Sequence, residues 1–388
     1  MMQIVYSPST TTEYCAITFR KIYERAIDTA SSYGAIDIER QKRLNTWLLS
    51  LYNRQVCIND SMTIVIFTQV HGGGFGNAIR GLCTSMLLVV LFDTAFKLNT
   101  FEDYIRIFLF NPFPNTGEPF SRSASKQVEW HFDPYTTIEN QKATIPLPSN
   151  SPIDVTVSTV YDAVTRIHSD AVDDKLRSIG FLPSVAAIGE YERMKEIHSI
   201  IYRLLLNPSF ELCSVVNSYT RLFKDKYSVG VQIRMGGNMS NTKDAAFMNM
   251  TRVMGVADEI RRLLSLKNES NAVLFVSADT SSIVDYFRES LNSIRIISVK
   301  EYSIGHSASA YGNRGNKQQW EQVTKRAIID LMILKECDHL ITTSGSSYGD
   351  LATELQQSYG LQVTLEPFLK EKGLKCSVYN RRKGVGVY

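Results

Sequence analysis

Hydrophobic and polar positions along the first hundred residues predict helices around one buried strand. Residues 1–60 are polar with the spacing of helices, and Thr63–Thr68 is a β-branched run typical of a buried strand. A glycine-rich turn, His71–Gly76, leads into residues 77–97, which are almost continuously apolar without proline and predict a buried helix. This order of strand, glycine loop and helix is the start of a parallel βαβ unit.

The second half of the chain repeats this alternation more clearly. Helices are predicted at about residues 243–266, 281–291, 318–337 and 349–358, and they separate five strand-like runs: Ser228–Arg234, Ala272–Ser277, Ile294–Val299, His339–Thr343 and Gln362–Leu365. Such alternation is typical of a doubly wound parallel sheet, which binds ligands at the carboxyl ends of its strands. Residues 111–160, by contrast, are rich in Pro, Ser and Asn and predict loops.

The length of 388 residues suggests two domains. We place the boundary near residue 215 and expect an α/β fold of two Rossmann-like domains that face each other across a cleft. The expected N-terminal domain covers residues 1–214 and the C-terminal domain residues 215–370. Residues 371–388 complete a basic C-terminal cluster, which we interpret as a solvated tail.

Charge and composition exclude several classes of function. The 42 basic and 39 acidic residues give a net charge of only +3, so we expect no nucleic-acid partner. The longest fully apolar run, Met86–Phe92, is far below the roughly 20 residues of a membrane span, so we expect none in this chain. Residues 1–19 lack a signal-peptide pattern, which leaves a cytosolic protein or an anchor outside this chain. The six cysteines contain no Cys-x-x-Cys pair, which argues against zinc and permits disulfides without requiring them.

Two familiar interpretations of the glycine-rich loop fail. A dinucleotide fingerprint requires a third glycine, but Ile79 stands at that position. The segments His71–Gly74 and Gly345–Gly349 match hydrolase motifs, but none of the six histidines follows Ser347 to act as its base.

A nucleotide-sugar transferase explains the same residues better. Such an enzyme neutralises a diphosphate leaving group with backbone N–H groups at helix N-termini, small hydroxyl side chains and a fixed arginine. Arg234 ends a predicted buried strand, and it could also serve there in a structural salt bridge. Thr342–Ser347 end another strand and begin a helix, where their hydroxyls can cap the helix and bind phosphate.

Three segments, in this order, resemble fucosyltransferases: Gly74–Ile79, Val229–Arg234 and Thr342–Ala352. The nearest pattern is that of the plant xyloglucan type, glycosyltransferase family 37, with G-L-G-N-R, I-G-I-Q-x-R and T-S-x-x-S-T-F-G-Y-V-A. Smaller similarities lie at Asn111–Pro114 and Ala272–Ser277, so the resemblance covers roughly residues 60–360. It implies a GT-B fold, GDP-fucose as the donor, and inverting transfer of L-fucose to a glycan hydroxyl without a cofactor or an obligatory metal.

The resemblance also implies roles for individual residues. Arg234 matches the arginine that pairs with the GDP phosphates and is the expected catalytic residue. The other positions that match the family's donor-binding segments are Gly74, Gly76, Asn77, Gln232, Asp279, Arg326, Ser344, Ser346, Ser347 and Tyr348. Among these, Asp279 falls where related enzymes contact the guanine or ribose, and Arg326 falls where family 37 has a lysine.

The departures from the family concern the acceptor more than the donor. Ala78 replaces the arginine of G-L-G-N-R, Asp350 replaces a tyrosine, and Gln232 occupies the histidine position of the H-x-R motif of other fucosyltransferases. The candidate general bases are Glu102, Asp103, Glu118 and Asp133. Two alternatives remain open: a nucleotide-sugar or glycan-binding protein of the same fold without turnover, and a protein O-fucosyltransferase.

Overall fold

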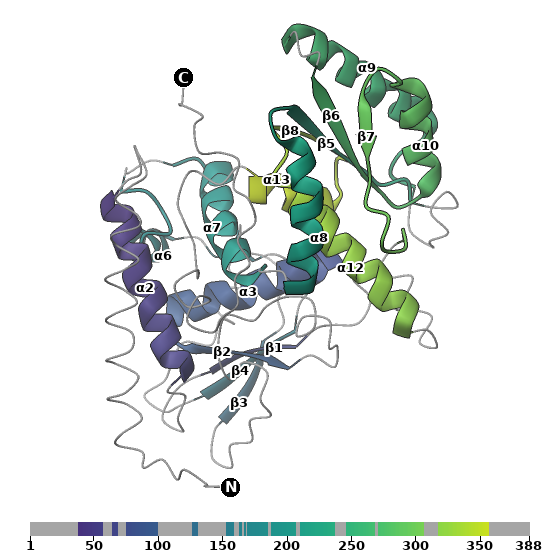
Figure 1. Cartoon of the computed structure of the whole chain (residues 1–388). Helices are drawn as coiled ribbons and strands as arrows, with labels where there is room; N and C mark the ends of the chain where they lie inside the picture. Colours follow the sequence, from purple (N-terminus) through teal and green to yellow (C-terminus); the bar gives the residue numbers. More distant parts are fainter. Residues whose placement is uncertain are drawn as a thin grey trace, which may run out of the picture. The chain divides into compact units, whose positions relative to one another are not determined.

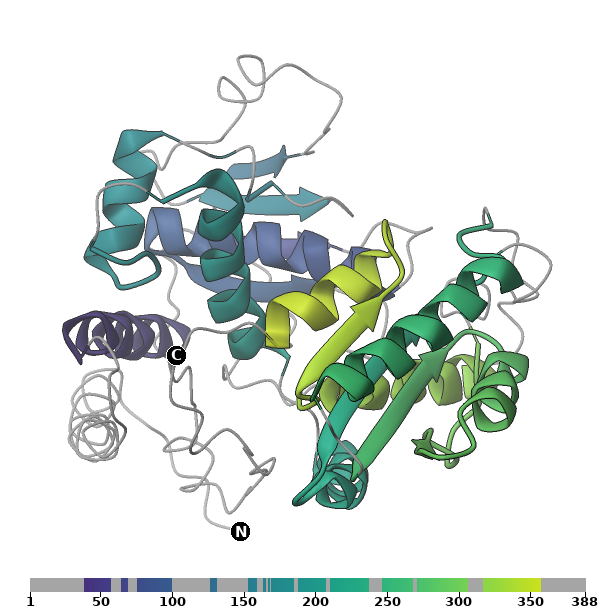
Figure 2. The ribbon, with the colours of Figure 1, turned by 90° about the horizontal axis from the view of Figure 1, so that it is seen from above.

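A computed structural model describes the parts of the chain that carry its regular structure. These are residues 38–56, 64–68, 75–99, 126–130, 153–158, 163–164, 167, 169–184, 188–206, 210–236, 246–267, 271–305 and 317–356. They form two compact units (Figures 1 and 2). The first holds the elements up to α7, and the second holds Phe75–Asn77 together with the elements from α8 to α13.

The first unit is built on a parallel sheet. Its described strands run in the order β2-β1-β4-β3, with bounds Ala95–Asn99, Ile64–Thr68, Ile153–Ser158 and Lys126–Trp130. Helix α3, Phe75–Phe92, lies along one face of this sheet (Figure 1). Helices α2, α6 and α7 complete the described part of the unit, at Ile38–Val56, Asp170–Ser178 and Glu190–Leu205.

Helix α3 is the buried helix that the apolar pattern predicts. By length and composition it could cross a membrane, but 78% of its apolar window is buried inside the protein. Its residues Met86–Val90 are fully buried, and so are Phe67 of β1 and Val157 of β4. Such burial is typical of a core helix, because a sheet needs an apolar layer against its face.

The second unit is a doubly wound sheet of the Rossmann type. Its described strands are all parallel in the order β7-β6-β5-β8, with bounds Arg295–Ile297, Ala272–Ala278, Tyr227–Ile233 and His339–Thr342. The chain moves outward from β5 to β6 and β7 and then returns to β8 on the other side of β5. The carboxyl ends of β5 and β8 therefore form the topological switch point, where such sheets bind ligands.

Helices cover both faces of this second sheet (Figure 1). On one face, Val229, Val231 and Ile233 of β5 pack in one apolar cluster with residues of α9 and α10, at Met250–Lys267 and Ser281–Ser290. On the other face lie α8, α12 and α13, at Phe210–Thr220, Lys317–Leu334 and Ser347–Gln356. Because side chains alternate along a strand, β5 turns Gly230 and Gln232 toward this second face.

Most of the elements predicted in the second half of the chain are confirmed. Three expectations are wrong, two in the first half and one in the second. The helix predicted over residues 77–97 ends at Phe92, because Asp93 adopts a left-handed conformation (φ 51°) and β2 begins at Ala95. The predicted loop region 111–160 contains β3 and β4, and β4 lies inside the sheet. Helix α9 begins at Met250, seven residues later than the predicted start at 243. The predicted strand Gln362–Leu365 lies outside the described residues.

The cysteines of the described segments fall into two kinds. Cys83 in α3 and Cys337 after α12 are buried and are not disulfide-bonded. Cys213 in α8 is disulfide-bonded.

Candidate functional site

The candidate site begins where β5 and β8 end side by side. The backbone N–H of Arg234, the first residue after β5, donates to Oγ1 of Thr343 at 2.9 Å. Thr343 in turn follows β8, and its own N–H donates to the carbonyl of Gln232 at 3.1 Å. These bonds extend the strand pairing past both strand ends, so the positions of Arg234 and Thr343 are fixed relative to each other.

The side chain of Gln232 strengthens this junction. It is buried, and its Oε1 accepts a second bond from the N–H of Thr343 at 3.2 Å. A Cβ atom on Gly349, in the first turn of α13, would lie only 2.7 Å from the same oxygen. Gln232 therefore packs between β8 and α13, and its carboxamide oxygen is already used within the protein.

Asp279 holds the turn that follows Arg234. Its two carboxylate oxygens accept the backbone N–H groups of Met235 and Gly236, both at 3.0 Å. Asp279 lies one residue past β6, so it ties the carboxyl end of β6 to the turn after β5. Both carboxylate oxygens thus have protein partners. The predicted contact of Asp279 with a guanine or ribose stays a prediction.

The guanidinium of Arg234 lies over an aromatic ring. Its Cζ is 4.6 Å from the centroid of the Phe247 ring, and its Nε is buried. The sequence interpretation missed Phe247, because it placed the residue inside the helix predicted at about residues 243–266, whereas α9 begins only at Met250. The signal in the sequence was a short apolar run, Ala245–Met248, between Asp244 and Asn249.

The N-terminus of α13 forms the next part of the site. Gly345 adopts φ 75°, a conformation that favours glycine, and it turns the chain from β8 into the helix. Ser346 is buried and caps the helix: its Oγ accepts the N–H of Gly349 at 3.3 Å. The partial positive charge of a helix N-terminus attracts anions, so Ser347 and Tyr348 in its first turn lie where a phosphate would be stabilised.

Gly76 belongs to the same compact unit as α13 and approaches its first turn. A Cβ atom at Gly76 would lie 2.8 Å from Oγ of Ser347 and 2.9 Å from the backbone nitrogen of Tyr348. Only glycine permits this approach without a shift of the backbone. The structure therefore brings Gly76 together with two other predicted donor-binding residues, while Gly74 lies outside the described residues.

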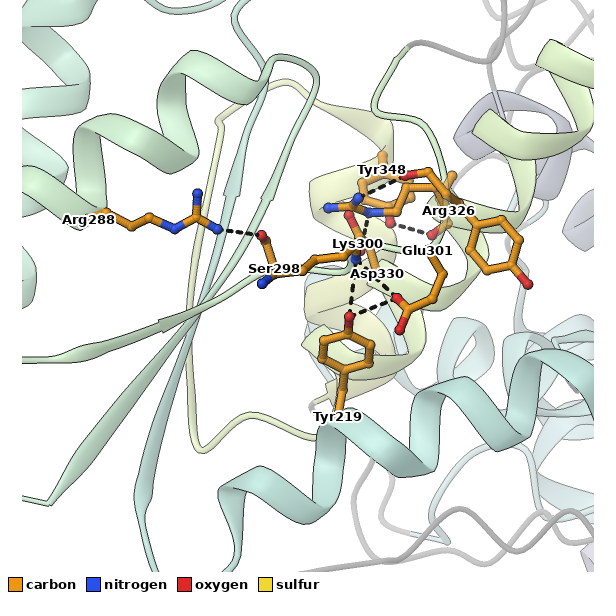
Figure 3. Close-up of polar contacts among 10 residues, drawn as sticks. Tyr219, Arg288, Ser298, Lys300, Glu301, Arg326, Asp330 and Tyr348 are labelled. Carbon is orange, nitrogen blue, oxygen red and sulfur yellow. Dashed lines mark hydrogen bonds and ion pairs between the residues drawn. The ribbon is translucent and has the colours of Figure 1, made fainter.

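Arg326 occupies a different environment from the one that its predicted donor contact suggests. It is 4% exposed, its Nε donates to Asp330 at 2.8 Å, and its Nη1 donates to the carbonyl of Tyr302 at 3.2 Å. Burial raises the pKa of Asp330, and the charge of Arg326 opposes that rise. Figure 3 shows this pair among Tyr348, Glu301 and Tyr219. Arg326 thus stabilises the interior of the unit, and a role in donor binding stays a prediction.

The side chain of Tyr348 is likewise engaged within the protein. Its hydroxyl donates to the carbonyl of Ala327 in α12 at 2.5 Å. Burial of the hydroxyl, together with the nearby carboxylate of Asp330, raises the pKa of Tyr348 well above its usual value. Tyr348 therefore stays neutral, and its side chain anchors α13 on α12. Of this residue, only the backbone lies at the helix N-terminus.

One more tyrosine supports the segment after β7. The hydroxyl of Tyr219 in α8 donates to Glu301 at 2.7 Å and accepts the N–H of Lys300 at 3.1 Å (Figure 3). Burial and the bond to Glu301 raise the pKa of Tyr219 to about 12.

Within the described part of the chain, no group of three or more His, Cys, Asp and Glu side chains could hold a metal ion.

Comparisons with known proteins show that the fold of this chain is a known one. No protein-family model matches the sequence, and no curated protein matches it. Among solved structures, that of a point mutant of Arabidopsis thaliana FUT1 in complex with GDP is similar, with a TM-score of 0.51, 13% identity, and coverage of 90% of this chain and 78% of that one.

Two further structures resemble this chain less. One is the α-1,6-fucosyltransferase NodZ soaked with GDP-fucose, with a TM-score of 0.46, 13% identity, and coverage of 76% of this chain and 92% of that one. The other is POFUT1 in complex with GDP, with a TM-score of 0.40, 10% identity, and coverage of 78% and 97%. The α/β fold with two parallel sheets is therefore shared with FUT1, and the fold implied by the fucosyltransferase resemblance is confirmed.

Proposed function

We propose that this protein is a fucosyltransferase that moves L-fucose from GDP-fucose to a hydroxyl of a glycan acceptor. The observation that carries the proposal is the position of Arg234. Its backbone is fixed at the switch point of a parallel sheet, beside the strand that leads into the N-terminus of α13. A guanidinium and a helix N-terminus together suit a diphosphate, because both offer N–H donors to its oxygens.

The choice of GDP-fucose over other nucleotide sugars rests on two supports. One is the ordered set of motifs that resembles family 37. The other is the fold shared with FUT1, whose structure contains GDP. Neither support identifies the acceptor, so the proposal extends only to the donor and to the class of reaction.

The proposed reaction is a direct displacement with inversion at the anomeric carbon of fucose. The bond from that carbon to the β-phosphate oxygen breaks, and a bond to the acceptor oxygen forms. The acceptor proton leaves to a general base, and the four sequence candidates for that base lie outside the described residues. Arg234 stabilises the negative charge that grows on the departing GDP, which is where preorganised donors contribute most to the rate.

Calorimetric binding of GDP, UDP and ADP to the purified protein tests this proposal. We expect selective binding of GDP, and we expect Arg234→Ala to weaken it because the arginine pairs with the diphosphate. With GDP-fucose as the substrate, we expect slow hydrolysis without acceptor, which the same substitution slows by a factor on the order of 100 to 1,000.

A matched control comes from another arginine of the same unit. Arg262 on α9 is exposed and pairs with Glu259 on the same helix, so Arg262→Ala should leave GDP binding unchanged. Equal affinity for GDP, UDP and ADP would refute the GDP-fucose proposal. Selective GDP binding without any release of fucose would instead support the alternative, a nucleotide-sugar-binding protein of the same fold without turnover.

A further inference from the structure

The guanidinium of Arg234 must be held in one orientation if it is to bind a ligand tightly. Arginine carries a long, flexible side chain, and holding it in one geometry costs conformational entropy. If that cost were met only when the ligand binds, it would lower both affinity and rate. The backbone bonds of Arg234 fix its Cα, but the guanidinium extends several bonds beyond it.

Phe247 supplies a surface for this guanidinium. The ring centroid lies 4.6 Å from Cζ of Arg234, within the range in which a cation over an aromatic face is attracted by its quadrupole. Contact with a ring engages the face of a guanidinium, whereas its N–H donors lie along its edge. An arginine held over a ring can therefore still bind phosphate oxygens.

The backbone around Phe247 is itself fixed to the turn after Arg234. The N–H of Phe247 donates to the carbonyl of Met235 at 2.9 Å, and the N–H of Met248 approaches the same oxygen at 3.4 Å. The sulfur of Met248 accepts from Oγ1 of Thr343 at 3.2 Å. The segment that carries the ring is thus attached both to the end of β5 and to the end of β8.

We propose that Phe247 is a positioning residue that holds the Arg234 guanidinium in its ligand-binding orientation before the nucleotide arrives. The ring does not touch the reacting atoms in this proposal and acts only through Arg234. The inference rests on the proposed function for its effect on catalysis. Its structural part, an ordered guanidinium in the free protein, does not depend on the identity of the ligand.

A set of substitutions separates the aromatic face from simple bulk. Phe247→Leu keeps an apolar side chain but removes the ring, and we expect it to lower the affinity for GDP about fivefold to tenfold. Phe247→Trp and Phe247→Tyr keep a ring and should restore most of the affinity. Tyr286→Leu removes a half-buried aromatic residue of α10 in the same unit, and it should leave GDP binding unchanged.

A double-mutant cycle tests whether the ring acts through Arg234. In the Arg234→Ala background, Phe247→Leu should cause no further loss of GDP affinity, because the group that the ring supports is gone. An additive loss would show that Phe247 contributes independently of Arg234 and would overturn the proposal. So would a Phe247→Leu protein that binds GDP as well as the wild type.

A measurement without ligand separates this proposal from the proposed function. The Nε–H signal of Arg234, assigned by its disappearance in Arg234→Lys, should show slow solvent exchange and restricted motion by NMR relaxation. In Phe247→Leu it should exchange faster and become mobile. If the wild type fails to bind GDP while this difference is observed, the fucosyltransferase proposal fails and the positioning role stands. A signal that is already mobile in the wild type overturns the positioning role.

Discussion

At the scale of single residues, two ion pairs in the second unit show how environment decides what a charge contributes. Arg326 and Asp330 lie one helical turn apart in α12, with side chains 5% and 3% exposed. Arg288 and Asp285 lie three residues apart in α10, with side chains 44% and 61% exposed. Both pairs have a 2.8 Å contact, so geometry alone does not separate them.

We expect Asp330→Ala to be strongly destabilising. It leaves the buried Arg326 without its carboxylate, which typically costs about 3 to 5 kcal/mol. The effect should appear as faster hydrogen exchange of the α12 amides, which reports the local opening free energy. The exposed pair is the control: Asp285→Ala should change the opening free energy of α10 by less than about 0.5 kcal/mol.

A third variant distinguishes charge from shape at this position. Replacing both partners, as Arg326→Met with Asp330→Leu, should recover much of the stability, because an apolar pair needs no desolvation of charge. If Asp330→Ala exchanged like the wild type, the ion pair would not be the feature that stabilises this interior.

At the scale of elements, the junction of β5, β8 and α13 depends on close approach. A Cβ atom at Gly349 would lie 2.7 Å from Oε1 of Gln232 and 3.0 Å from Cβ of Thr342. Gly349→Ala must therefore push α13 away from the two strands, and overpacking of this kind typically costs about 1 to 3 kcal/mol. We expect a lower midpoint of thermal unfolding and weaker GDP binding, since the helix N-terminus moves.

The control substitution should change the stability in the opposite direction. Gly255 lies inside α9, and a Cβ atom there would meet no atom within 4 Å. Gly255→Ala should therefore stabilise the protein by roughly 0.5 to 1 kcal/mol, because alanine is the better helix former. Equal effects of the two substitutions would show that Gly349 is not constrained by Gln232.

The sequence predicts best the elements whose apolar run is closed by a polar residue or a glycine. β5, β6 and β8 are apolar runs that end at polar or glycine residues, and their bounds agree with the structure to within a residue. Only Asp93 and Thr94 separate β2 from α3, without a proline or glycine, so the two apolar segments are easily taken for one helix. β4 lies in a segment dense in proline and serine, and its pairing with β1 decides its structure.

The candidate site likewise has parts that the sequence predicts and parts that it does not. Arg234 and the turn before α13 were predictable, because each lies where a predicted strand ends and a motif begins. Phe247 was not, because its partner lies thirteen residues earlier and the contact depends on how the turn after β5 folds back. The engagement of Gln232 and Asp279 with protein groups was equally invisible, since their partners lie on another strand end or in a turn. Arg326 is different, because its partner Asp330 lies four residues later in the same helix and only its bond to Tyr302 comes from a loop.

At the scale of the whole molecule, each unit has its own parallel sheet and its own buried core. Compact parts with separate cores can unfold separately, so we expect two unfolding transitions in urea rather than one. The three tryptophans of the chain distinguish them: Trp47 and Trp130 lie in the first unit, and Trp320 lies in α12 of the second.

Fluorescence of two variants makes this prediction measurable. Trp320→Phe retains only reporters of the first unit, and Trp47→Phe with Trp130→Phe retains only the reporter of the second. Because the proposed ligand groups lie in the second unit, GDP at 100 times its dissociation constant should stabilise the second transition by about 2.7 kcal/mol and leave the first unchanged. Arg234→Ala should remove most of that shift at the same GDP concentration, while Arg262→Ala should retain it. If GDP stabilised both transitions equally, the two units would unfold as one cooperative body, and nucleotide binding could not be assigned to the second sheet from its stability alone.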